Sequence, residues 1–355
     1  MVARRTPLLD SHKALGAKLT EFAGWDMPLQ YEGIVAEHNA VRSSVGVFDV
    51  SHLGKLRVSG ASAEVALQRA VTADVAIEPG RATYALALSD DAGCIDDVFV
   101  YRLGRAEWLV VPNAANVGAV AEAIAVGGAE PIDEAEHWAI LAVQGPESYE
   151  AFDAAFPDAG APELTLHEWR ALDVLGAPGL VARTGYTGER GFELYAPAAT
   201  APAALRRLLD AGVRPVGLGA RDTLRLEMGY ALYGHELSRA IDPLEAGLGW
   251  AIAWATPFRG REALARVREE GPARRLFGVR CRGRGVPRRG HRVLAGDAQV
   301  GTVTSGNYSP TLGTGIALAL GPTAHAPGRG ETVAIEARGR RIDGAIVKPP
   351  FVTKD

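Results

Sequence analysis

Two adjacent aspartates, Asp96 and Asp97, stand near the start of the run Gly93–Tyr101, whose apolar residues are typical of a β-strand. Neighbouring side chains of a strand point to opposite faces, so Asp97 shares a face with Phe99 and at least one carboxylate is expected beside apolar groups. An ionised carboxylate in such surroundings is costly unless it has a ligand, a cation or a catalytic task. A second interpretation is a turn, because aspartates favour turns and Ser89–Gly93 comes directly before the pair.

Another candidate is a glycine-rich segment, Gly185–Gly191, which lies between two strand-like runs. Glycine permits a tight backbone there. In the strand that follows, Glu193 and Tyr195 are expected on one face, and Phe192 and Leu194 on the other. The segment is interpreted either as a functional loop or as a plain hairpin.

A predicted helix over Ala220–Gly229 carries two arginines, Arg221 and Arg225, one turn apart and therefore on one face. Arginines near a helix start could bind a carboxylate with two parallel hydrogen bonds. The alternative is a helix stabilised by its own ion pair, since Asp222 precedes Arg225 by three residues.

Two segments near the C-terminus carry a weaker signal. Gly285–His291 is a basic turn, and Gly301–Gly313 has small polar residues that would line a closely packed loop. Ordinary surface turns explain both segments equally well.

Composition excludes several classes of protein. The chain has 355 residues, of which 47% are hydrophobic and 23% charged, so it is globular rather than disordered. No apolar run approaches about 18 residues and no secretory signal is evident, so we expect no membrane partner and a cytoplasmic location. The net charge of −4 argues against nucleic-acid binding. The cysteines and histidines lack metal-ligand spacing, and no dinucleotide motif occurs, so we expect no metal, flavin or nicotinamide.

The order of the predicted elements indicates an α+β protein with an additional small all-β domain. Helices and strands are mixed as far as Glu270, and short strands with Gly and Pro turns follow to the end. Residues 257–355 carry 18 basic and eight acidic side chains, so the basic excess coincides with the β domain. Either genome composition accounts for these arginines, or this part faces an anion or an acidic partner.

Six spaced motifs are similar to those of the glycine cleavage T-protein family, the tetrahydrofolate-dependent aminomethyltransferases. The motifs are FAGWDMPLQY (22–31), EHNAVRSSVGVFDVSHLG (37–54), GCIDDVFVYR (93–102), GYTGERGFEL (185–194), ARDTLRLEMGYALYGHEL (220–237) and GTVTSGNYSPTLG (301–313). The resemblance runs from about Thr6 to Val352 in the family's order.

The resemblance implies three domains in a ring, or cloverleaf, around a central folate cavity. Domain 1 is discontinuous and α+β, comprising residues 1–52 and 137–250, and domain 2 is an α+β insertion over residues 53–136. A connecting helix region, 251–273, leads to domain 3, an all-β barrel or jelly-roll-like domain over residues 274–355.

The resemblance also implies a reaction and a partner. Family members take the aminomethyl group carried on the dihydrolipoyl arm of the H-protein, transfer its methylene to tetrahydrofolate and release ammonia. The products are 5,10-methylenetetrahydrofolate and dihydrolipoyl H-protein. Tetrahydrofolate is therefore the implied small-molecule substrate, and lipoylated H-protein the implied partner.

The motifs imply roles for individual residues. Asp97 would be the catalytic carboxylate beside folate N10, Glu193 would accept the pterin N–H donors, and Arg221 would lie near the benzoyl-glutamate end. Trp250 would form an aromatic wall, and Arg289 would reach the folate from the third domain. Less distinctive matches to folate-cavity positions are Leu53, Tyr84, Leu109, Asn113 and Tyr186.

The chain departs from the family pattern at a few pocket positions. No lysine occurs in Ala255–Gly260, and leucines at 53 and 109 replace a methionine and an aromatic residue that are frequent there. The main alternative function is a tetrahydrofolate-dependent demethylase with a different methyl donor. Two others are the C-terminal half of a sarcosine or dimethylglycine dehydrogenase, which needs an upstream flavin domain, and a folate-binding iron–sulfur assembly factor, whose cysteine motif neither Cys94 nor Cys281 matches.

Overall fold

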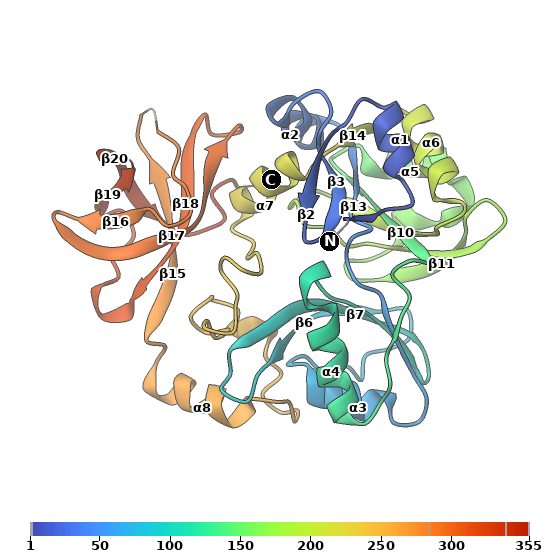
Figure 1. Cartoon of the computed structure of the whole chain (residues 1–355), viewed down its shortest axis with the longest axis horizontal. Helices are drawn as coiled ribbons and strands as arrows, with labels where there is room; N and C mark the ends of the chain where they lie inside the picture. Colours follow the sequence, from blue (N-terminus) through green and yellow to red (C-terminus); the bar gives the residue numbers. More distant parts are fainter. Residues whose placement is uncertain (1–2, 284, 338, 354–355) are drawn as a thin grey trace. The chain divides into compact units, whose positions relative to one another are not determined.

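The computed structural model describes residues 3–283, 285–337 and 339–353. The chain divides into two compact units, the first comprising Met1–Ala85 and Val98–Arg221 and the second Leu86–Asp97 and Asp222–Asp355. Figure 1 shows the mixed helices and sheets, which confirm the α+β class. The ring arrangement and the three-domain boundaries stay predictions.

A six-stranded sheet forms the main core of the first unit. Its strands, in spatial order, are β11 (Trp169–Asp173), β12 (Pro178–Ala182), β13 (Gly191–Pro197), β10 (Trp138–Gln144), β4 (Gly46–Asp49) and β14 (Arg214–Val216). Neighbours are antiparallel except β4 and β14. Helices α5 (Ser148–Ala155) and α6 (Ala201–Asp210) pack on β10 and β13, and Phe152, Phe192 and Leu205 are buried in the shared apolar core.

Two smaller sheets lie mainly in the first unit, although the end of β6 and the start of β7 belong to the second. The five-stranded sheet has the order β6 (Ala82–Leu88), β7 (Cys94–Gly104), β8 (Glu107–Val111), β5 (Leu56–Ser59) and β9 (Ile132–Asp133). Helices α3 (Ala63–Ala70) and α4 (Val117–Gly127) contact each other and lie side by side over it (Figure 1). The three-stranded sheet, which the sequence analysis did not predict, contains β1 (Arg4–Arg5), β3 (Trp25–Gln30) and β2 (Lys18–Phe22), followed by α2 (Ile34–Ser43); α1 (Leu9–Ala14) lies between β1 and β2.

The second unit is dominated by a closed barrel, which confirms the predicted C-terminal β domain. Its strands, in order, are β15 (Arg274–Cys281), β18 (Thr314–Pro322), β17 (Ala298–Ser309), β16 (Arg292–Ala295), β19 (Thr332–Ala337) and β20 (Arg340–Val347). All neighbours are antiparallel, and closure leaves no free strand edge. Phe277, Val293 and Ile335 lie in its apolar core.

Two further helices matter for the site. Helix α7 (Leu218–Met228) begins in the first unit and ends in the second, and α8 (Arg261–Glu270) precedes the barrel. The segment Gly301–Gly313, expected as a loop, is instead mostly strand β17, because its small residues alternate in and out of the barrel wall. Across the described part of the chain, no helix is both long and apolar enough to span a membrane.

Candidate active site

The loop that leads into β13 is held by Gln144, the last residue of β10. Gln144 Nε2 donates to the Thr184 carbonyl oxygen at 3.1 Å, and the Thr187 hydroxyl donates to Gln144 Oε1 at 2.9 Å. Gly185 and Gly191 pass so close to the Gln144 side chain that a Cβ atom on either would clash with it. The loop is thus both a hairpin connection and a rigid support for the strand that carries Glu193.

Glu193 of β13 is a buried carboxylate, 8% exposed. Its Oε2 accepts a 2.6 Å hydrogen bond from the Thr184 hydroxyl and a longer one, 3.5 Å, from Tyr101, which in turn accepts from Tyr195 at 3.2 Å. Within the described residues, no hydrogen bond reaches Oε1 and no cation pairs with the carboxylate. Burial raises the pKa of Tyr101, which keeps the phenol protonated as a donor. Such a carboxylate suits a ligand that donates N–H groups.

The start of α7 is fixed by Glu37, a buried carboxylate of α2. Its Oε2 accepts from the Gly217 backbone N–H at 2.7 Å, directly before the helix begins. Its Oε1 accepts from the backbone N–H groups of Tyr31 and Gly33 at 2.7 and 2.9 Å. Three backbone donors therefore converge on one side chain, which positions the helical turn that carries Arg221.

Arg221 projects from that turn, and it forms no ion pair with any residue that the structure describes. Its guanidinium carbon lies 4.7 Å from the centre of the Tyr186 ring, and Nη1 is buried with no hydrogen-bond partner among the described residues. Burial lowers the pKa of Arg221, while the nearby charge of Glu193 raises it. A buried arginine whose Nη1 has no hydrogen-bond partner is suited to bind a carboxylate of a ligand.

An aromatic row runs from Tyr84 towards Glu193 in the first unit. The rings of Tyr84 and Phe99 are 5.8 Å apart, and those of Phe99 and Tyr101 are 6.2 Å apart. Leu109 of β8 lies opposite Tyr101 in the antiparallel register. Two of the less distinctive candidates, Tyr84 and Leu109, are therefore neighbours of the Glu193 hydrogen-bond partners.

The turn that contains Leu53 lies beside the residue preceding Asn113. The Gly54 N–H donates to the Pro112 carbonyl oxygen at 2.9 Å, which joins the two segments. The residue before Leu53, His52, is buried, and the charge of Arg221 acts on it. Seven of the ten predicted site residues are thus linked through neighbours within the first unit.

The second unit contains Asp97, near the start of β7. Asp96 is fully buried, and Asp97 is half-buried on the opposite face of the strand, as the alternation predicts. The Cys94 N–H donates to the carbonyl oxygens of Ser238 and Ile241, at 3.0 and 3.2 Å, which anchors the strand before the two aspartates. Both aspartates lie within the strand, so the turn interpretation does not apply to them. The turn lies in the preceding segment, Ser89–Gly93.

The remaining two predicted residues lie on other elements of the second unit. Trp250 belongs to a short 3₁₀ turn, Gly249–Ala251, and is 71% exposed. Arg289 is exposed in the turn before β16, and no hydrogen bond or ion pair involves its side chain within the described residues. No group of three or more His, Cys, Asp or Glu side chains among the described residues could hold a metal ion.

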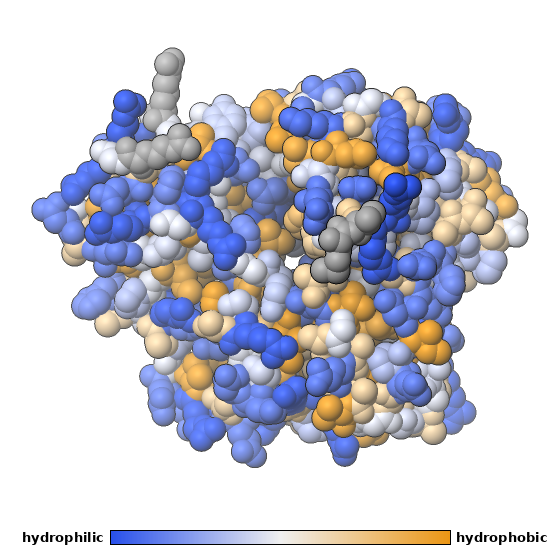
Figure 2. All heavy atoms as spheres, in the orientation of Figure 1, coloured by the Kyte–Doolittle hydropathy of each residue, from blue (hydrophilic) through white to orange (hydrophobic). Residues whose placement is uncertain are grey.

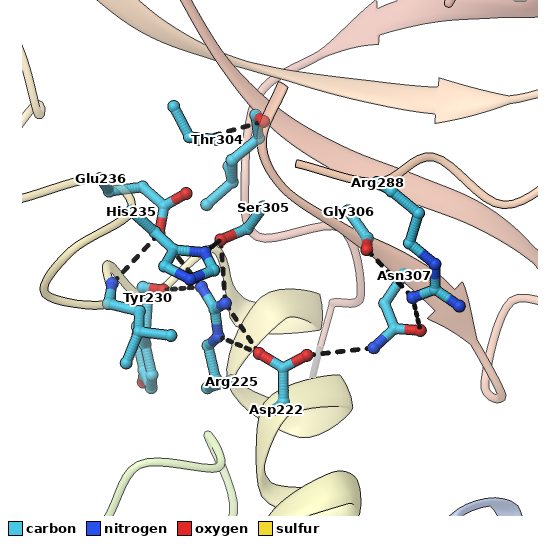
Figure 3. A network of polar contacts seen from close by, with 12 residues as sticks. Asp222, Arg225, Tyr230, His235, Glu236, Arg288, Thr304, Ser305, Gly306 and Asn307 are labelled. Atoms are coloured by element: carbon cyan, nitrogen blue, oxygen red, sulfur yellow. Dashed lines mark hydrogen bonds and ion pairs between the residues drawn. The ribbon is translucent and has the colours of Figure 1, made fainter. Parts of the chain in front are cut away.

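A buried arginine, Arg225, ties the second half of α7 to the barrel (Figure 3). Its guanidinium pairs with Asp222 at 2.7 Å and with Glu236 at 3.2 Å, and donates to the Ser305 hydroxyl at 2.9 Å. The interpretation of this helix as ion-paired through Asp222 and Arg225 is therefore confirmed. Because Arg225 is only 1% exposed and fully engaged in these contacts, it is a structural residue.

The same network reaches the turn that carries Arg289. Asn307 Nδ2 donates to Asp222 Oδ2 at 3.0 Å, and Arg288 Nη1 donates to Asn307 Oδ1 at 3.0 Å (Figure 3). Arg288 is the chain neighbour of Arg289, so within this unit the turn is coupled to α7 through Asn307. Both segments are recognisable in the sequence, but the hydrogen bonds between them are visible only in the structure.

Four residues that surround Glu193, Arg221 and the loop before β13 were not predicted. They are His52, Tyr101, Gln144 and Thr184. A signal existed for Tyr101, which is four residues from Asp97 and on the same face of a predicted strand. Gln144 is a polar residue at the end of an apolar strand, but its role depends on a loop 40 residues further along the chain.

Comparison with known proteins gives one consistent result. Residues 8–256 match the GCVT N-terminal domain, and residues 274–353 match the glycine cleavage T-protein C-terminal barrel domain. Aminomethyltransferases of Mycobacterium avium and Rubrobacter xylanophilus are each 46% identical, over 98% of this chain and 96% and 94% of theirs. The crystal structure of glycine cleavage system aminomethyltransferase T from Bartonella henselae covers 98% of both chains with a TM-score of 0.91 and 32% identity. The chain therefore belongs to the glycine cleavage T-protein family, the aminomethyltransferases.

Proposed function

We propose that this aminomethyltransferase transfers the methylene of an H-protein-bound aminomethyl group to tetrahydrofolate. The carbon–sulfur and carbon–nitrogen bonds of the donor break, ammonia and dihydrolipoyl H-protein leave, and the methylene bridges N5 and N10 of the folate. The enzyme class follows from the family, whereas the donor, the acceptor and the residue roles are inferred. A cytoplasmic location of the protein stays a prediction.

The observation that carries the folate proposal is the unsatisfied pair Glu193 and Arg221. One is a buried carboxylate with a free oxygen, and the other is a cation with a buried, unpartnered nitrogen. Tetrahydrofolate has N–H donors at its pterin end and carboxylates at its glutamate end, so it complements both. Glu193 requires a hydrogen-bond donor, whereas Arg221 requires an anionic acceptor. A single small anion or cation would therefore satisfy only one of them.

We assign the reacting end of the folate to Asp97. An ionised carboxylate near N10 favours the positive charge that develops on this nitrogen as it attacks, and binding both reactants in one site supplies their orientation. Further contacts with the folate are proposed for Leu53, Tyr84, Leu109, Asn113, Tyr186, Trp250 and Arg289.

The barrel is proposed to help bind an acidic H-protein. Figure 2 shows hydrophilic side chains over most of the visible barrel surface. Arg280, Arg282 and Arg340 are exposed and have no ion pair within the described residues. Unpaired surface arginines increase the rate and affinity of binding to an acidic partner in a salt-dependent way. Moderate salt is therefore expected to weaken H-protein binding well before folate binding, and equal H-protein affinity at low and high salt would contradict this proposal.

The reaction is tested by supplying the purified chain with aminomethylated H-protein and tetrahydrofolate and measuring 5,10-methylenetetrahydrofolate. Product that depends on both reactants supports the proposal. Tetrahydrofolate binding without product, together with demethylation of a nitrogen, oxygen or sulfur donor, would favour the demethylase alternative.

A further inference from the structure

One histidine of the first unit is buried without any hydrogen bond. His52 is 5% exposed, and within the described residues neither ring nitrogen has a hydrogen-bond partner. Its ring meets that of Phe22 edge to face, with centroids 5.4 Å apart, which orients the imidazole without satisfying its nitrogens. Buried polar side chains nearly always have a partner, because the water they lose must be replaced.

A second histidine shows what a satisfied buried imidazole looks like in this unit. His12 is 1% exposed, its Nε2 is 2.8 Å from Asp49 Oδ2, and its Nδ1 is 2.9 Å from the Tyr31 hydroxyl. Both nitrogens of His12 are used by the fold, so its role is structural. His52 has no such role to explain its polarity.

Another unpartnered atom lies in the same neighbourhood as His52. Arg221 Nη1 is buried without a partner, and burial together with the Arg221 charge lowers the pKa of His52 to about 3. His52 is therefore a neutral imidazole with one donor and one acceptor nitrogen. One ligand that contacts both side chains would supply partners for the two buried, unpartnered nitrogens, His52 Nδ1 and Arg221 Nη1.

We propose that His52 hydrogen-bonds, as a neutral imidazole, to the same bound folate that Arg221 contacts. The inference rests on the proposed folate site and adds a binding residue to it. Arg221 suits a carboxylate of the folate, whereas a neutral imidazole suits an uncharged polar group such as an amide or a pterin N–H or carbonyl. Leu53, which follows His52, is itself a proposed folate contact, so the two proposals concern the same turn.

His52→Leu separates binding from folding, because leucine keeps an apolar side chain in place and removes both nitrogens. The dissociation constant for tetrahydrofolate, measured by equilibrium dialysis on the full chain, is expected to rise roughly threefold to tenfold, the effect of one lost hydrogen bond. The melting temperature without folate is expected to stay the same or rise, since no unsatisfied polar group stays buried. The matched control, His12→Leu, is expected to lower the melting temperature.

The conservative variants His52→Asn and His52→Gln place an amide near Nδ1 or Nε2, and one of them is expected to recover part of the affinity. Native-like folate affinity of His52→Leu would overturn the inference. A melting temperature lowered as far as in His12→Leu would also overturn it, because His52 would then be structural. Failure of the native chain to bind tetrahydrofolate would refute the proposed folate site itself, a result distinct from both.

Discussion

Glu37→Gln tests whether the position of Arg221 depends on one buried carboxylate. Glu37 is 3% exposed and accepts hydrogen bonds from the backbone N–H groups of Tyr31, Gly33 and Gly217. Glutamine has one oxygen, so the amide nitrogen must face at least one of the buried donors. The substitution preserves the volume of the side chain and changes only its hydrogen bonding and charge.

The magnitude follows from the number of bonds affected. A hydrogen bond to a charged group contributes about 1.5–3 kcal/mol, and a buried donor left unpaired costs about 1–3 kcal/mol. The Gly217 donor loses its acceptor if the glutamine oxygen stays with Tyr31 and Gly33, and those two bonds lose their charge assistance. We therefore expect Glu37→Gln to lower the free energy of unfolding by about 3–5 kcal/mol. Because Gly217 leads into α7, tetrahydrofolate affinity at Arg221 is expected to fall as well.

Urea unfolding without folate, monitored by circular dichroism, measures the free energy of unfolding. Equilibrium dialysis measures the affinity for tetrahydrofolate. The matched control is Glu32→Gln in the same segment, since the Glu32 side chain is 70% exposed and forms only a 3.8 Å ion pair with Arg214. Equal unfolding midpoints for the two variants would refute the reasoning that Glu37 anchors this region.

Three further predictions concern single buried charges. Glu193→Gln is expected to weaken tetrahydrofolate binding roughly tenfold to a hundredfold, the loss of a charged acceptor, without lowering stability in the absence of folate; unchanged affinity in a dialysis assay would exclude Glu193 from the site. Burial lowers the pKa of Lys55 from 10.5 to about 8, so the unfolded chain binds more protons between these values and the stability contribution of Lys55 rises with pH there. Lys55→Met is therefore expected to exceed the native chain in free energy of unfolding at pH 7, by an amount on the order of 3 kcal/mol. This difference is expected to shrink towards pH 10.5, and a difference in urea unfolding that does not change with pH would contradict the prediction. Arg225→Met leaves Glu236 buried without its cation and is expected to destabilise by about 3–5 kcal/mol in thermal unfolding, more than Arg225→Lys, and equal melting temperatures would contradict this.

The strand patterns of the first unit were predictable because they are local. Alternation alone placed Glu193 and Tyr195 on one face of β13 and Phe192 and Leu194 on the other, and the structure confirms this through the contact with Tyr101 and the apolar core. The three-stranded sheet was not predicted, since β1 has only two residues and its pairing with β3 is parallel. Such short strands leave no periodic signal.

The supports of the site were harder to predict because their partners are distant in the chain. Gln144 holds a loop that begins 40 residues later, Glu37 accepts from Gly217 across 180 residues, and Ser305 contacts Arg225 across 80. A sequence pattern identifies a charged residue but not which backbone donors will surround it. The proposed roles of Glu193 and Arg221 came from family motifs, whereas the buried, unpartnered nitrogen of Arg221 is visible only in three dimensions.

The most direct test of the proposed reaction is ammonia release from aminomethylated H-protein, with and without tetrahydrofolate, by the native chain and by Asp97→Asn. The native chain is expected to release ammonia in a folate-dependent manner, and Asp97→Asn is expected to lose most of this activity while still binding folate. Asp90→Asn, whose carboxylate is 82% exposed and pairs with Arg259, is the control and should keep native activity. Native rates in Asp97→Asn would contradict the assignment of the catalytic carboxylate, and no release by the native chain despite folate binding would contradict the proposed donor.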